Sequence, residues 1–432
     1  MSNLVAGGML LFGVNMYAAP AFKVDIVTDR AEKPLYQLGE QATFIISVTN
    51  PDGEPLNDGD IVKIEFANEF NAPFETVEQV VTDKPVSISR KLDTPGFLRC
   101  KATVERAGET VTKQIMAGFS PEAIQPGQTL PSDFEEFWQN AKAEALKLPL
   151  DAEMVLVPEK SSDLANYYKV SIANINNTRM YGFLSVPKAP GKYPIMFTVP
   201  GAGPGYTSVP TEFPVDKVIQ MTLNVHAFEV EDATAQAKYD ELNKDGLYMY
   251  IGMPDREDYY YYRTILGLCR GVKFLTGLPQ WNGKEFVMYG SSQGGAMTYA
   301  TTALNNDIVT AAAMNVPAFC DYAANNRGGS PGWPVTAKPD VITSAANAEM
   351  MQYYDAVNFA RHIKCPVIIC VGLLDSTCPP GAVFAAYNTL NTPKAIWQSP
   401  LMGHDFDPGY TEFRMKWMNG KLGLAEDIAP KK

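Results

Sequence analysis

The feature that most constrains the fold is an alternation of short apolar strands with helical segments from about residue 131 onward. Apolar runs of the length of buried strands occur at residues 195–199, 286–289 and 366–371, and a helical segment at residues 263–275 separates the first two. Strands that alternate with helices build a mostly parallel sheet with helices on both faces. The sequence therefore predicts an α/β domain over residues 121–432.

A helix-capping pattern marks the start of this domain. Residues 120–127 contain the Pro and Gly that are typical of a linker. Ser132 is then followed three residues later by Glu135, just before the apolar pair Phe137 and Trp138. Serine with glutamate at this spacing forms a capping box. We therefore expect Ser132 to cap the first helix of the domain.

Residues 22–120 follow a different pattern, with short strands between turn signals and no helical period. An apolar run at residues 42–48 ends at the turn sequence NPDG, and residues 61–66 alternate with period two. This pattern predicts a β-sandwich. Residues 36–40 (YQLGE) resemble the opening of immunoglobulin-like modules in secreted bacterial proteins. Because the region contains no histidine, we expect a spacer or a lid beside the active site, with carbohydrate binding as the alternative.

Residues 1–21 have the character of a secretory signal. Residues 4–17 are apolar and glycine-rich, and small residues for cleavage follow at Ala18, Ala19 and Ala21. This pattern predicts a signal segment and hence a periplasmic or secreted protein. The usual basic residues before the apolar run are missing, so a buried N-terminal strand is the alternative. No later stretch is long and apolar enough for a membrane span.

The charge and the cysteines argue against two classes of function. The chain has 36 basic and 48 acidic residues, a net charge of −12. Phosphate binding needs a basic face, so we expect no nucleic-acid partner. The six cysteines include no C-x-x-C pair, which argues against zinc or a redox dithiol. We expect buried free thiols, and a disulfide such as Cys320 with Cys378 is the alternative.

Residues 290–295 (GSSQGG) contain the pattern G-x-S-x-G with Ser292 at its centre, after one strand and before a helical run. This strand–turn–helix context is what a nucleophile elbow requires, whereas the pattern alone is only a glycine-rich turn. The glycines permit a sharp turn where side chains would clash. The turn would point the backbone N–H of Gln293 at a developing oxyanion. We therefore predict an α/β-hydrolase with Ser292 as its nucleophile.

The nucleophile needs a base, and the chain has only three histidines, His226, His362 and His404. In α/β-hydrolases the chain order is serine, acid, histidine. His226 precedes Ser292, and His362 lies at the end of a helix, where a histidine usually acts as a C-terminal cation or packs. His404 lies in a loop after a late strand at residues 395–397. Elimination therefore selects His404.

The acid should follow a strand between the serine and His404. Asp375 directly follows the strand at residues 366–371, where its carboxylate would hold the imidazole in the right tautomer. Asp321 is the competitor, because it follows a strand at residues 310–316. An aspartate after a strand is often only a helix cap, so position alone does not decide between the two.

A second oxyanion donor should come from a loop after an earlier strand. The glycine-rich residues 197–205 (FTVPGAGPG) fit this place. Such a loop can also hold phosphate, but neither G-x-G-x-x-G nor G-x-x-x-x-G-K-[ST] occurs here. We assign the second donor to the backbone N–H of Ala202.

Several motifs carry a family resemblance. They are PSDFEEFW at residues 131–138, YYYYR at 259–263, GSSQGG at 290–295, NVP at 315–317, VGLLD at 371–375, CPP at 378–380, VFAAYN at 383–388 and GHD at 403–405. In order and spacing they resemble the acetyl xylan esterase / cephalosporin-C deacetylase family (carbohydrate esterase family 7). The resemblance implies a triad of Ser292, Asp375 and His404, no cofactor, and release of acetate from small acetylated sugars. It favours Asp375 over Asp321.

The chain departs from that family at three places. The family's Arg-Gly-Gln motif is replaced by residues 224–228 (NVHAF), Ala202 stands where tyrosine is usual, and the N-terminal β region is extra. These changes lie at the pocket mouth and beside it. They leave open the size of the substrate and whether the chain forms a homo-oligomer like the family's hexameric ring.

We therefore expect a serine carboxylesterase that removes acetyl groups from acetylated oligosaccharides, such as xylo-oligosaccharides, through an acyl-enzyme. One alternative is an esterase or peptidase acting on larger acyl substrates, such as feruloyl esters or peptides. Another is a non-catalytic glycan-binding homologue. Aromatic candidates for the pocket entrance, with packing below the sheet edge as their alternative role, are Tyr206, Tyr248, Tyr250, the tyrosines at 259–262, and Phe319.

Overall fold

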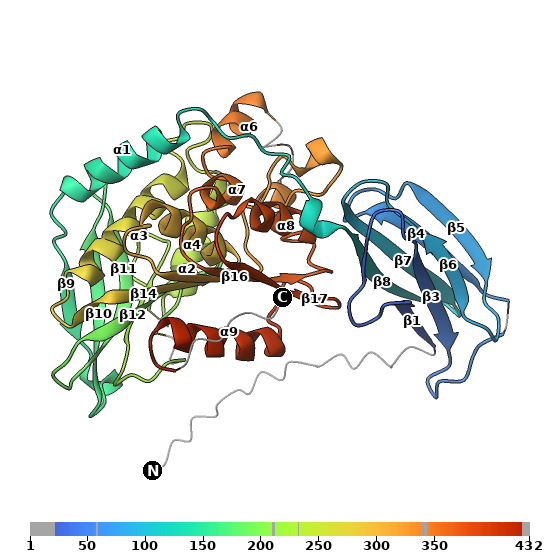
Figure 1. Cartoon of the computed structure of the whole chain (residues 1–432), viewed down its shortest axis with the longest axis horizontal. Helices are drawn as coiled ribbons and strands as arrows, with labels where there is room; N and C mark the ends of the chain where they lie inside the picture. The colour runs from blue at the N-terminus through green and yellow to red at the C-terminus, as the bar shows by residue number, and fades with distance from the viewer. Residues whose placement is uncertain are drawn as a thin grey trace, which may run out of the picture.

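The computed structural model describes residues 22–425, except 58, 210, 211, 232, 339 and 341–343. It places a β region beside a larger α/β region (Figure 1). The expected signal segment lies outside the described residues, so it stays a prediction, as does the periplasmic or secreted location. None of the helices in the described part of the chain is long and apolar enough to cross a membrane.

The β region is a sandwich of two sheets. One has the strand order β1-β3-β6, with β1 (Lys23–Thr28), β3 (Ala42–Thr49) and β6 (Val86–Arg90). The other has the order β2-β8-β7-β4-β5, with β2 (Leu35–Tyr36), β8 (Glu109–Phe119), β7 (Gly96–Arg106), β4 (Ile61–Asn68) and β5 (Glu75–Val80). Side chains alternate between buried and more exposed along β1 and β3, so one face turns inward. Phe44 and Phe66 meet in the shared core. The predicted β-sandwich is confirmed.

The α/β region is built on one nine-stranded sheet with the order β17-β16-β15-β14-β12-β13-β11-β10-β9. Its strands are β9 (Glu153–Leu156), β10 (Ala165–Ala173), β11 (Arg179–Pro187), β12 (Tyr193–Val199), β13 (Ile219–Leu223), β14 (Trp281–Ser291), β15 (Ala311–Asn315), β16 (Val367–Gly372) and β17 (Lys394–Ser399). The strands from β17 to β13 run parallel, and β11, β10 and β9 continue the sheet antiparallel. Central strands such as β15 and β16 are buried throughout, which explains their continuous apolar runs.

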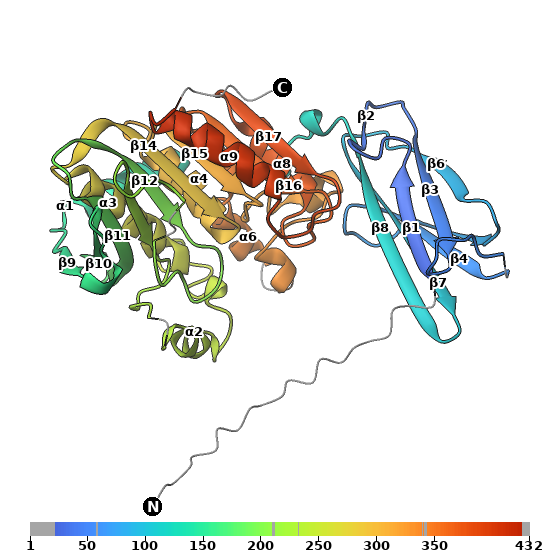
Figure 2. The ribbon, with the colours of Figure 1, turned by 90° about the horizontal axis from the view of Figure 1, so that it is seen from below.

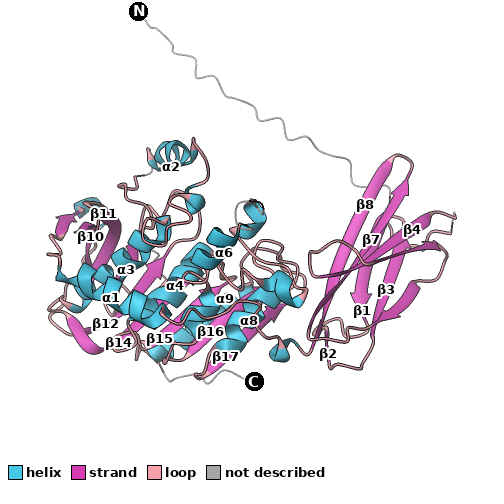
Figure 3. Ribbon diagram, turned by 90° about the horizontal axis from the view of Figure 1, so that it is seen from above, coloured by secondary structure: helices cyan, strands magenta, loops and turns pink. Residues whose placement is uncertain are grey.

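Helices cover both faces of this sheet, as predicted. The α-helices are α1 (Phe134–Lys147), α2 (Ala235–Asn243), α3 (Tyr260–Thr276), α4 (Gln293–Leu304), α6 (Ala345–Met351), α7 (Ala356–Ala360), α8 (Pro380–Thr389) and α9 (Pro408–Lys421). Short 3-10 helices are η1 (Pro121–Ala123), η2 (Pro158–Lys160), η3 (Tyr248–Tyr250), η4 (Ala324–Arg327) and η5 (Val335–Ala337). Figure 2 shows α9 on one face, and Figure 3 shows α1, α3, α4 and α8 over the other. The α/β-hydrolase fold is confirmed.

The predicted capping box at Ser132 is wrong. Helix α1 begins at Phe134, its N-cap residue is Asp133, and no side chain caps it. The Asp133 carboxylate instead pairs with Arg256 at 2.9 Å and accepts the hydroxyl hydrogen of Tyr353. These partners come from distant segments of the chain, so tertiary contacts replace the local cap that the sequence pattern predicted.

The six cysteines are all free and buried, as expected. The alternative of a disulfide between Cys320 and Cys378 is therefore wrong. Burial raises the pKa of each of these two thiols well above the ordinary value for a cysteine side chain. Neutral, buried thiols of this kind behave as small apolar side chains.

The carboxyl ends of the parallel strands meet at one edge of the sheet. Val199 at the end of β12 lies beside Gly290 of β14, and Ser291 lies beside Asn315 at the end of β15. Strand β12 has β13 on one side and β14 on the other, so the strand order reverses at this point. In open α/β sheets such a reversal creates the crevice in which ligands bind.

Candidate active site

Ser292 occupies a strained turn between β14 and α4. Its φ is 54° and its ψ is −119°, a conformation that non-glycine residues adopt only where the surroundings enforce it. Glycines permit the close approach: a Cβ on Gly290 would lie 2.1 Å from the carbonyl oxygen of Gly294, and one on Gly294 would lie 2.1 Å from that of Val199. The backbone therefore has the shape of a nucleophile elbow.

His404 lies between Ser292 and Asp375. Its Nε2 is 2.9 Å from Oγ of Ser292, and its Nδ1 is 2.8 Å from Oδ2 of Asp375. An ionised carboxylate only accepts hydrogen bonds, so Nδ1 carries the proton and Nε2 of the neutral ring accepts from the serine hydroxyl. A serine with this neighbour can lose its proton to the imidazole.

The Asp375 carboxylate is completely buried and is held by its own loop. Its Oδ1 accepts hydrogen bonds from the backbone N–H groups of Thr377 at 2.9 Å and Cys378 at 2.8 Å. This leaves Oδ2 free to accept from His404. The carboxylate therefore cannot rotate away from the imidazole without losing two hydrogen bonds.

Asp321 has other partners. Its Oδ1 accepts from the backbone N–H groups of Gly127 at 2.8 Å and Gln128 at 3.0 Å, and its Oδ2 pairs with Nε of Arg327 at 2.8 Å. Of the two competing acids, the structure brings Asp375 to His404 and leaves Asp321 beside the linker.

The two predicted oxyanion donors lie beside Ser292. Gln293 is the first residue of α4, where a backbone N–H has no partner within the helix. Ala202 follows β12 and lines the same cavity as Ser292. The loop comes close to the serine, because a Cβ on Gly201 would lie 3.8 Å from the Cβ of Ser292. The roles of both N–H groups stay a prediction.

Two side chains hold the loop that carries Ala202. Nε2 of Gln293 donates to the carbonyl oxygen of Gly201 at 3.2 Å, and Nε2 of His226 lies 2.9 Å from that of Gly203. These two carbonyl groups stand on either side of Ala202. The loop is therefore anchored on both sides of Ala202, which is itself exposed.

Tyrosines fix both of these side chains. The hydroxyl groups of Tyr248 and Tyr261 donate to Oε1 of Gln293, the latter at 2.6 Å. Nδ1 of His226 lies 2.6 Å from the hydroxyl of Tyr260. Since a carbonyl oxygen only accepts, Nε2 of His226 carries the proton and Nδ1 accepts from Tyr260. Burial lowers the pKa of His226 to about 4, so the ring is neutral at higher pH.

Ser292 and His404 open into a cavity of about 410 Å³. Its lining consists of Gly201, Ala202, Tyr206, Ser291, Ser292, Val316, Trp333, Thr377, His404, Asp405 and Phe406. Of the expected aromatic residues only Tyr206 belongs to this lining, whereas Tyr261 and Phe319 are buried and pack against each other behind it. Phe406 is 57% exposed and therefore presents an open aromatic face.

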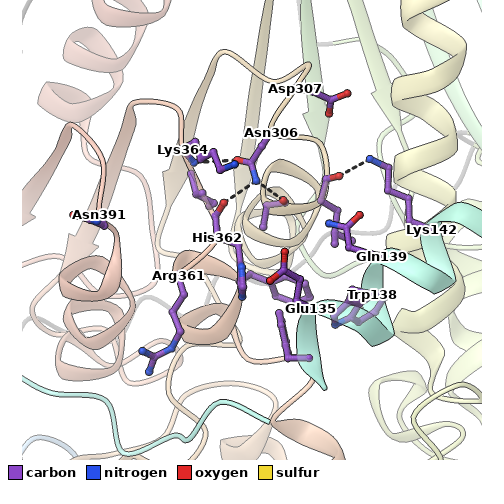
Figure 4. A pocket seen from close by; sticks show the side chains of 15 residues that line it. Glu135, Trp138, Gln139, Lys142, Asn306, Asp307, Arg361, His362, Lys364 and Asn391 are labelled. Atoms are coloured by element: carbon purple, nitrogen blue, oxygen red, sulfur yellow. Dashed lines mark hydrogen bonds between the residues drawn. The ribbon is translucent and has the colours of Figure 1, made fainter. Parts of the chain in front are cut away.

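A larger cavity, of about 700 Å³, shares no lining residue with the Ser292 cavity (Figure 4). Its polar side chains stabilise the local fold. Asn306 donates to the carbonyl of His362 and accepts from the N–H of Lys364, and Lys142 donates to the carbonyl of Leu304. The His362 ring stacks on Phe134 at 5.5 Å, so His362 has the packing role expected for it.

Among the described residues, one group of three side chains has the spacing of metal ligands, namely Asp375, Cys378 and His404. The chemistry of this donor set does not fit a metal. Nδ1 of His404 and Oδ2 of Asp375 already form a hydrogen bond with each other. Burial raises the pKa of the Cys378 thiol, which disfavours the thiolate that a metal needs.

Residues 122–421 match the model of a protein family described as acetyl xylan esterase. This chain belongs to the acetyl xylan esterase family. A relative, the acetyl esterase Axe7A of Xylanibacter ruminicola, is 32% identical over 337 residues, which are 76% of this chain and 75% of the relative. The chain is therefore an acetyl esterase homologue and a carboxylic ester hydrolase.

Solved acetyl xylan esterases share the fold. The enzyme from Paenibacillus sp. R4 matches with a TM-score of 0.59 and 26% identity, over 69% of this chain and 98% of that chain. Acetyl xylan esterase 1 from Thermoanaerobacterium sp. JW/SL YS485 matches with a TM-score of 0.58 and 22% identity, over 70% of this chain and 97% of that chain. The family match begins at residue 122, so the β-sandwich precedes the part that defines the acetyl xylan esterase family.

Sequence reasoning missed three residues of this candidate site. Chain order excludes His226 as the base because it precedes Ser292, although its place after β13, the strand next to β12, is a usable signal for a role at this site. Phe406 follows His404 by two positions and lines the cavity, so its closeness to the predicted base is the signal that could have found it. Trp333 also lines the cavity, and no pattern around it predicts this.

Proposed function

We propose that this member of the acetyl xylan esterase family is a serine carboxylesterase that removes acetyl groups from acetylated oligosaccharides, such as xylo-oligosaccharides. The observation that carries the proposal is the hydrogen-bonded series from Ser292 through His404 to Asp375 at the cavity wall. The family membership supports an acetyl ester as the group that is cleaved. The proposal assigns Ser292, Asp375 and His404 as the catalytic triad.

The first half of the proposed reaction forms an acyl-enzyme. Nε2 of His404 takes the proton of Ser292, and the serine oxygen attacks the ester carbonyl carbon. The carbonyl oxygen becomes negative and is held by the backbone N–H groups of Gln293 and Ala202. The C–O bond to the sugar then breaks, and His404 returns its proton to the leaving alcohol oxygen.

The second half releases acetate. Water enters, His404 takes one of its protons, and the hydroxide attacks the acetyl carbon bound to Ser292. A second tetrahedral intermediate forms in the same oxyanion site and collapses to acetate, while the serine oxygen regains its proton from His404. Asp375 stabilises the imidazolium in both halves. All of these steps use side chains and backbone of this chain, so the proposal needs no cofactor.

The cavity lining supports a sugar as the leaving group. Tyr206, Trp333 and Phe406 contribute aromatic surface around Ser292. Aromatic rings offer apolar area to the C–H faces of a sugar, and Phe406 is open to solvent. The backbone side of the cavity, at Gly201 and Ala202, carries almost no side chain and suits a small acyl group.

The test is acetate release from acetylated xylo-oligosaccharides by the wild type and by Ser292→Ala. The proposal expects release by the wild type and a loss of at least about 10³-fold in the variant. Release that survives in Ser292→Ala would contradict the assignment of the nucleophile. A parallel assay with feruloyl and acetyl aryl esters compares acyl size, and a preference for the feruloyl ester would favour the larger-acyl alternative.

A further inference from the structure

The β-sandwich contacts the segment that forms one wall of the active-site cavity. Residues Glu69–Asn71, which directly follow β4, form a turn that we name the module turn. Residues 327–334, which include Trp333, are named the Trp333 segment. The two are more than 250 positions apart in the chain and are joined by hydrogen bonds.

Glu69 makes the most costly of these contacts. It is 1% exposed and has a φ of 48°, so both its carboxyl group and its backbone are constrained. Its Oε2 accepts from the backbone N–H of Ser330 at 2.6 Å. Burial raises the pKa of this carboxyl. A buried acid is retained only where its partners compensate for the lost hydration.

Asn71 and Phe70 extend the contact. Nδ2 of Asn71 donates to the carbonyl oxygens of Gly328 at 3.0 Å and Gly329 at 3.2 Å. The Ser330 hydroxyl donates to Oδ1 of Asn71 at 2.9 Å and accepts from the N–H of Phe70 at 3.1 Å. Three successive residues of the module turn therefore hold three successive residues of the Trp333 segment.

The opposite end of the segment reaches the catalytic residues. The N–H of Trp333 donates to the carbonyl oxygen of Thr377 at 2.7 Å, and the N–H of Thr377 donates to Oδ1 of Asp375 at 2.9 Å. Trp333 and Thr377 both line the cavity of Ser292. Only Pro331 and Gly332 separate Ser330, which the module turn holds, from Trp333 at the wall of the cavity.

The module turn also touches the helix that follows the Asp375 loop. A Cβ added to Gly381, the second residue of α8, would lie 1.7 Å from Oε1 of Glu69. Phe97 of the sandwich packs against Phe384 of α8 at 5.5 Å. The sandwich therefore contacts both chain segments that flank the Trp333–Thr377 hydrogen bond.

We propose that the β-sandwich is a positioning element of the active site: the module turn fixes Trp333, and Trp333 in turn limits the size of the ester that reaches Ser292. The proposal assigns Glu69 and Asn71 as positioning residues that act through Trp333. It rests on the proposed esterase function. It gives the sandwich a role in substrate selection instead of that of a spacer.

The test compares Asn71→Ala, Glu69→Ala and Trp333→Ala with wild type, each in the full chain below its melting temperature. The measured quantity is the ratio of kcat/KM for p-nitrophenyl butyrate to that for p-nitrophenyl acetate. We expect Trp333→Ala to raise this ratio. We expect Asn71→Ala and Glu69→Ala to raise it as well, by about fivefold or more, since small misplacements near a nucleophile have large effects. The double variant Asn71→Ala with Trp333→Ala should have nearly the same ratio as Trp333→Ala alone, because both substitutions act on the same wall of the cavity.

Glu75→Ala is the matched control. Glu75 pairs with Arg90 at 2.6 Å inside the sandwich, so its loss perturbs the sandwich without touching the Trp333 segment. We expect an unchanged ratio in this variant. Hydrogen–deuterium exchange of residues 327–337 gives a second measurement that does not depend on activity. We expect the exchange to be faster in Asn71→Ala than in wild type, and to be unchanged in Glu75→Ala.

An unchanged ratio in Asn71→Ala and Glu69→Ala would overturn the inference, and so would an effect of Asn71→Ala that is fully additive with that of Trp333→Ala. Unchanged exchange of residues 327–337 in Asn71→Ala would also overturn it. Failure of the proposed function has a different signature, because the wild type itself would then hydrolyse neither ester.

Discussion

Nε2 of Gln293 donates to the carbonyl oxygen of Gly201 at 3.2 Å, so the residue after Ser292 holds the loop on the other side of the cavity. In a trans peptide the C=O and N–H groups point in opposite directions. The bond that fixes the Gly201 carbonyl therefore also fixes the direction of the Ala202 N–H. Gln293 contributes twice to the predicted oxyanion site, through its own backbone N–H and through the orientation of the second donor.

His226 holds the other end of the same loop, and its replacement should impair turnover. We expect His226→Phe, which keeps the aromatic stacking on Phe228 but loses the bond to Gly203, to lower kcat about 10- to 100-fold. Removing an oxyanion donor outright costs about 10²–10³, and a displaced donor costs less. KM should change little, because the loop acts on the transition state. Steady-state kinetics on p-nitrophenyl acetate measures this.

Tyr260→Phe separates the two bonds of His226. It removes the hydroxyl that donates to Nδ1 and leaves the bond from Nε2 to Gly203. We expect kcat to fall less than threefold, since a single neutral hydrogen bond contributes about 1 kcal/mol and this one does not touch the loop. Equal losses in the two variants would contradict a role for His226 through Gly203.

Asp375→Asn should leave the fold intact and nearly abolish turnover. Asparagine can still accept from the N–H groups of Thr377 and Cys378, but its amide no longer holds His404 in the tautomer that accepts from Ser292. The corresponding change in serine proteases lowers kcat about 10⁴-fold. Asp405→Asn, which removes the charge of the exposed acid next to His404 at the cavity wall, shows how much of the loss follows from a change of charge alone. A similar loss in both variants would count against Asp375 as the acid.

Phe406→Ala should weaken sugar binding without slowing the chemistry. Phe406 is 57% exposed at the cavity, where its ring can pack on a sugar. Aromatic contacts of this kind contribute about 0.5–1.5 kcal/mol, so we expect KM for acetylated xylo-oligosaccharides to rise about 2- to 10-fold. The kcat/KM for p-nitrophenyl acetate should stay within about twofold. A parallel loss on both substrates would show that Phe406 instead supports His404.

The contribution of Asp355 to the stability of the fold should decrease as the pH rises toward neutrality. Burial, together with the nearby Asp321 carboxylate, raises the pKa of Asp355 to about 7. Its pKa in the unfolded chain is about 3.9. Between these values the folded state binds a proton that the unfolded state does not, so the free energy of unfolding falls with rising pH. Burial also raises the pKa of Glu69 and Asp321, which acts in the same direction.

Between about pH 4 and 6.5 the lowered pKa of His226 acts in the opposite direction, so the Asp355 contribution is measured as a difference between wild type and Asp355→Asn. We expect the melting temperature of the wild type to fall between pH 5 and pH 8 by at least about 2–4 °C more than that of the variant, the shift that 1 kcal/mol produces in a large domain. Asp355→Asn should flatten this dependence. Its Oδ1 can keep the bonds from Asp321 and Val357, while the bond from Tyr322 to the other oxygen is lost. Differential scanning calorimetry at the two pH values measures both effects. An identical pH dependence in the variant would exclude Asp355 as its source.

The sequence by itself determined the features that depend on local pattern. Buried parallel strands need continuous apolar runs, and these appear as β12, β14 and β16. The elbow needs glycines around Ser292, because the backbone of neighbouring segments lies where their side chains would be. Chain order and the place of His362 at a helix end then left His404 as the predicted base, since the chain has only three histidines. Each of these features depends on a short stretch of sequence, so it could be predicted from that stretch.

Only the tertiary structure decided which groups with equivalent local patterns meet. Asp321 and Asp375 both follow parallel strands, and the choice depends on distant partners: the linker and Arg327 take up Asp321, while Asp375 reaches His404. The cap expected at Ser132 does not form either, and the neighbouring Asp133 bonds instead to Arg256 and Tyr353, which lie far away in the sequence. His226 and the module turn act through carbonyl and amide groups of other segments. Hydrogen bonds of this kind depend on three-dimensional distance, which the local sequence pattern does not contain.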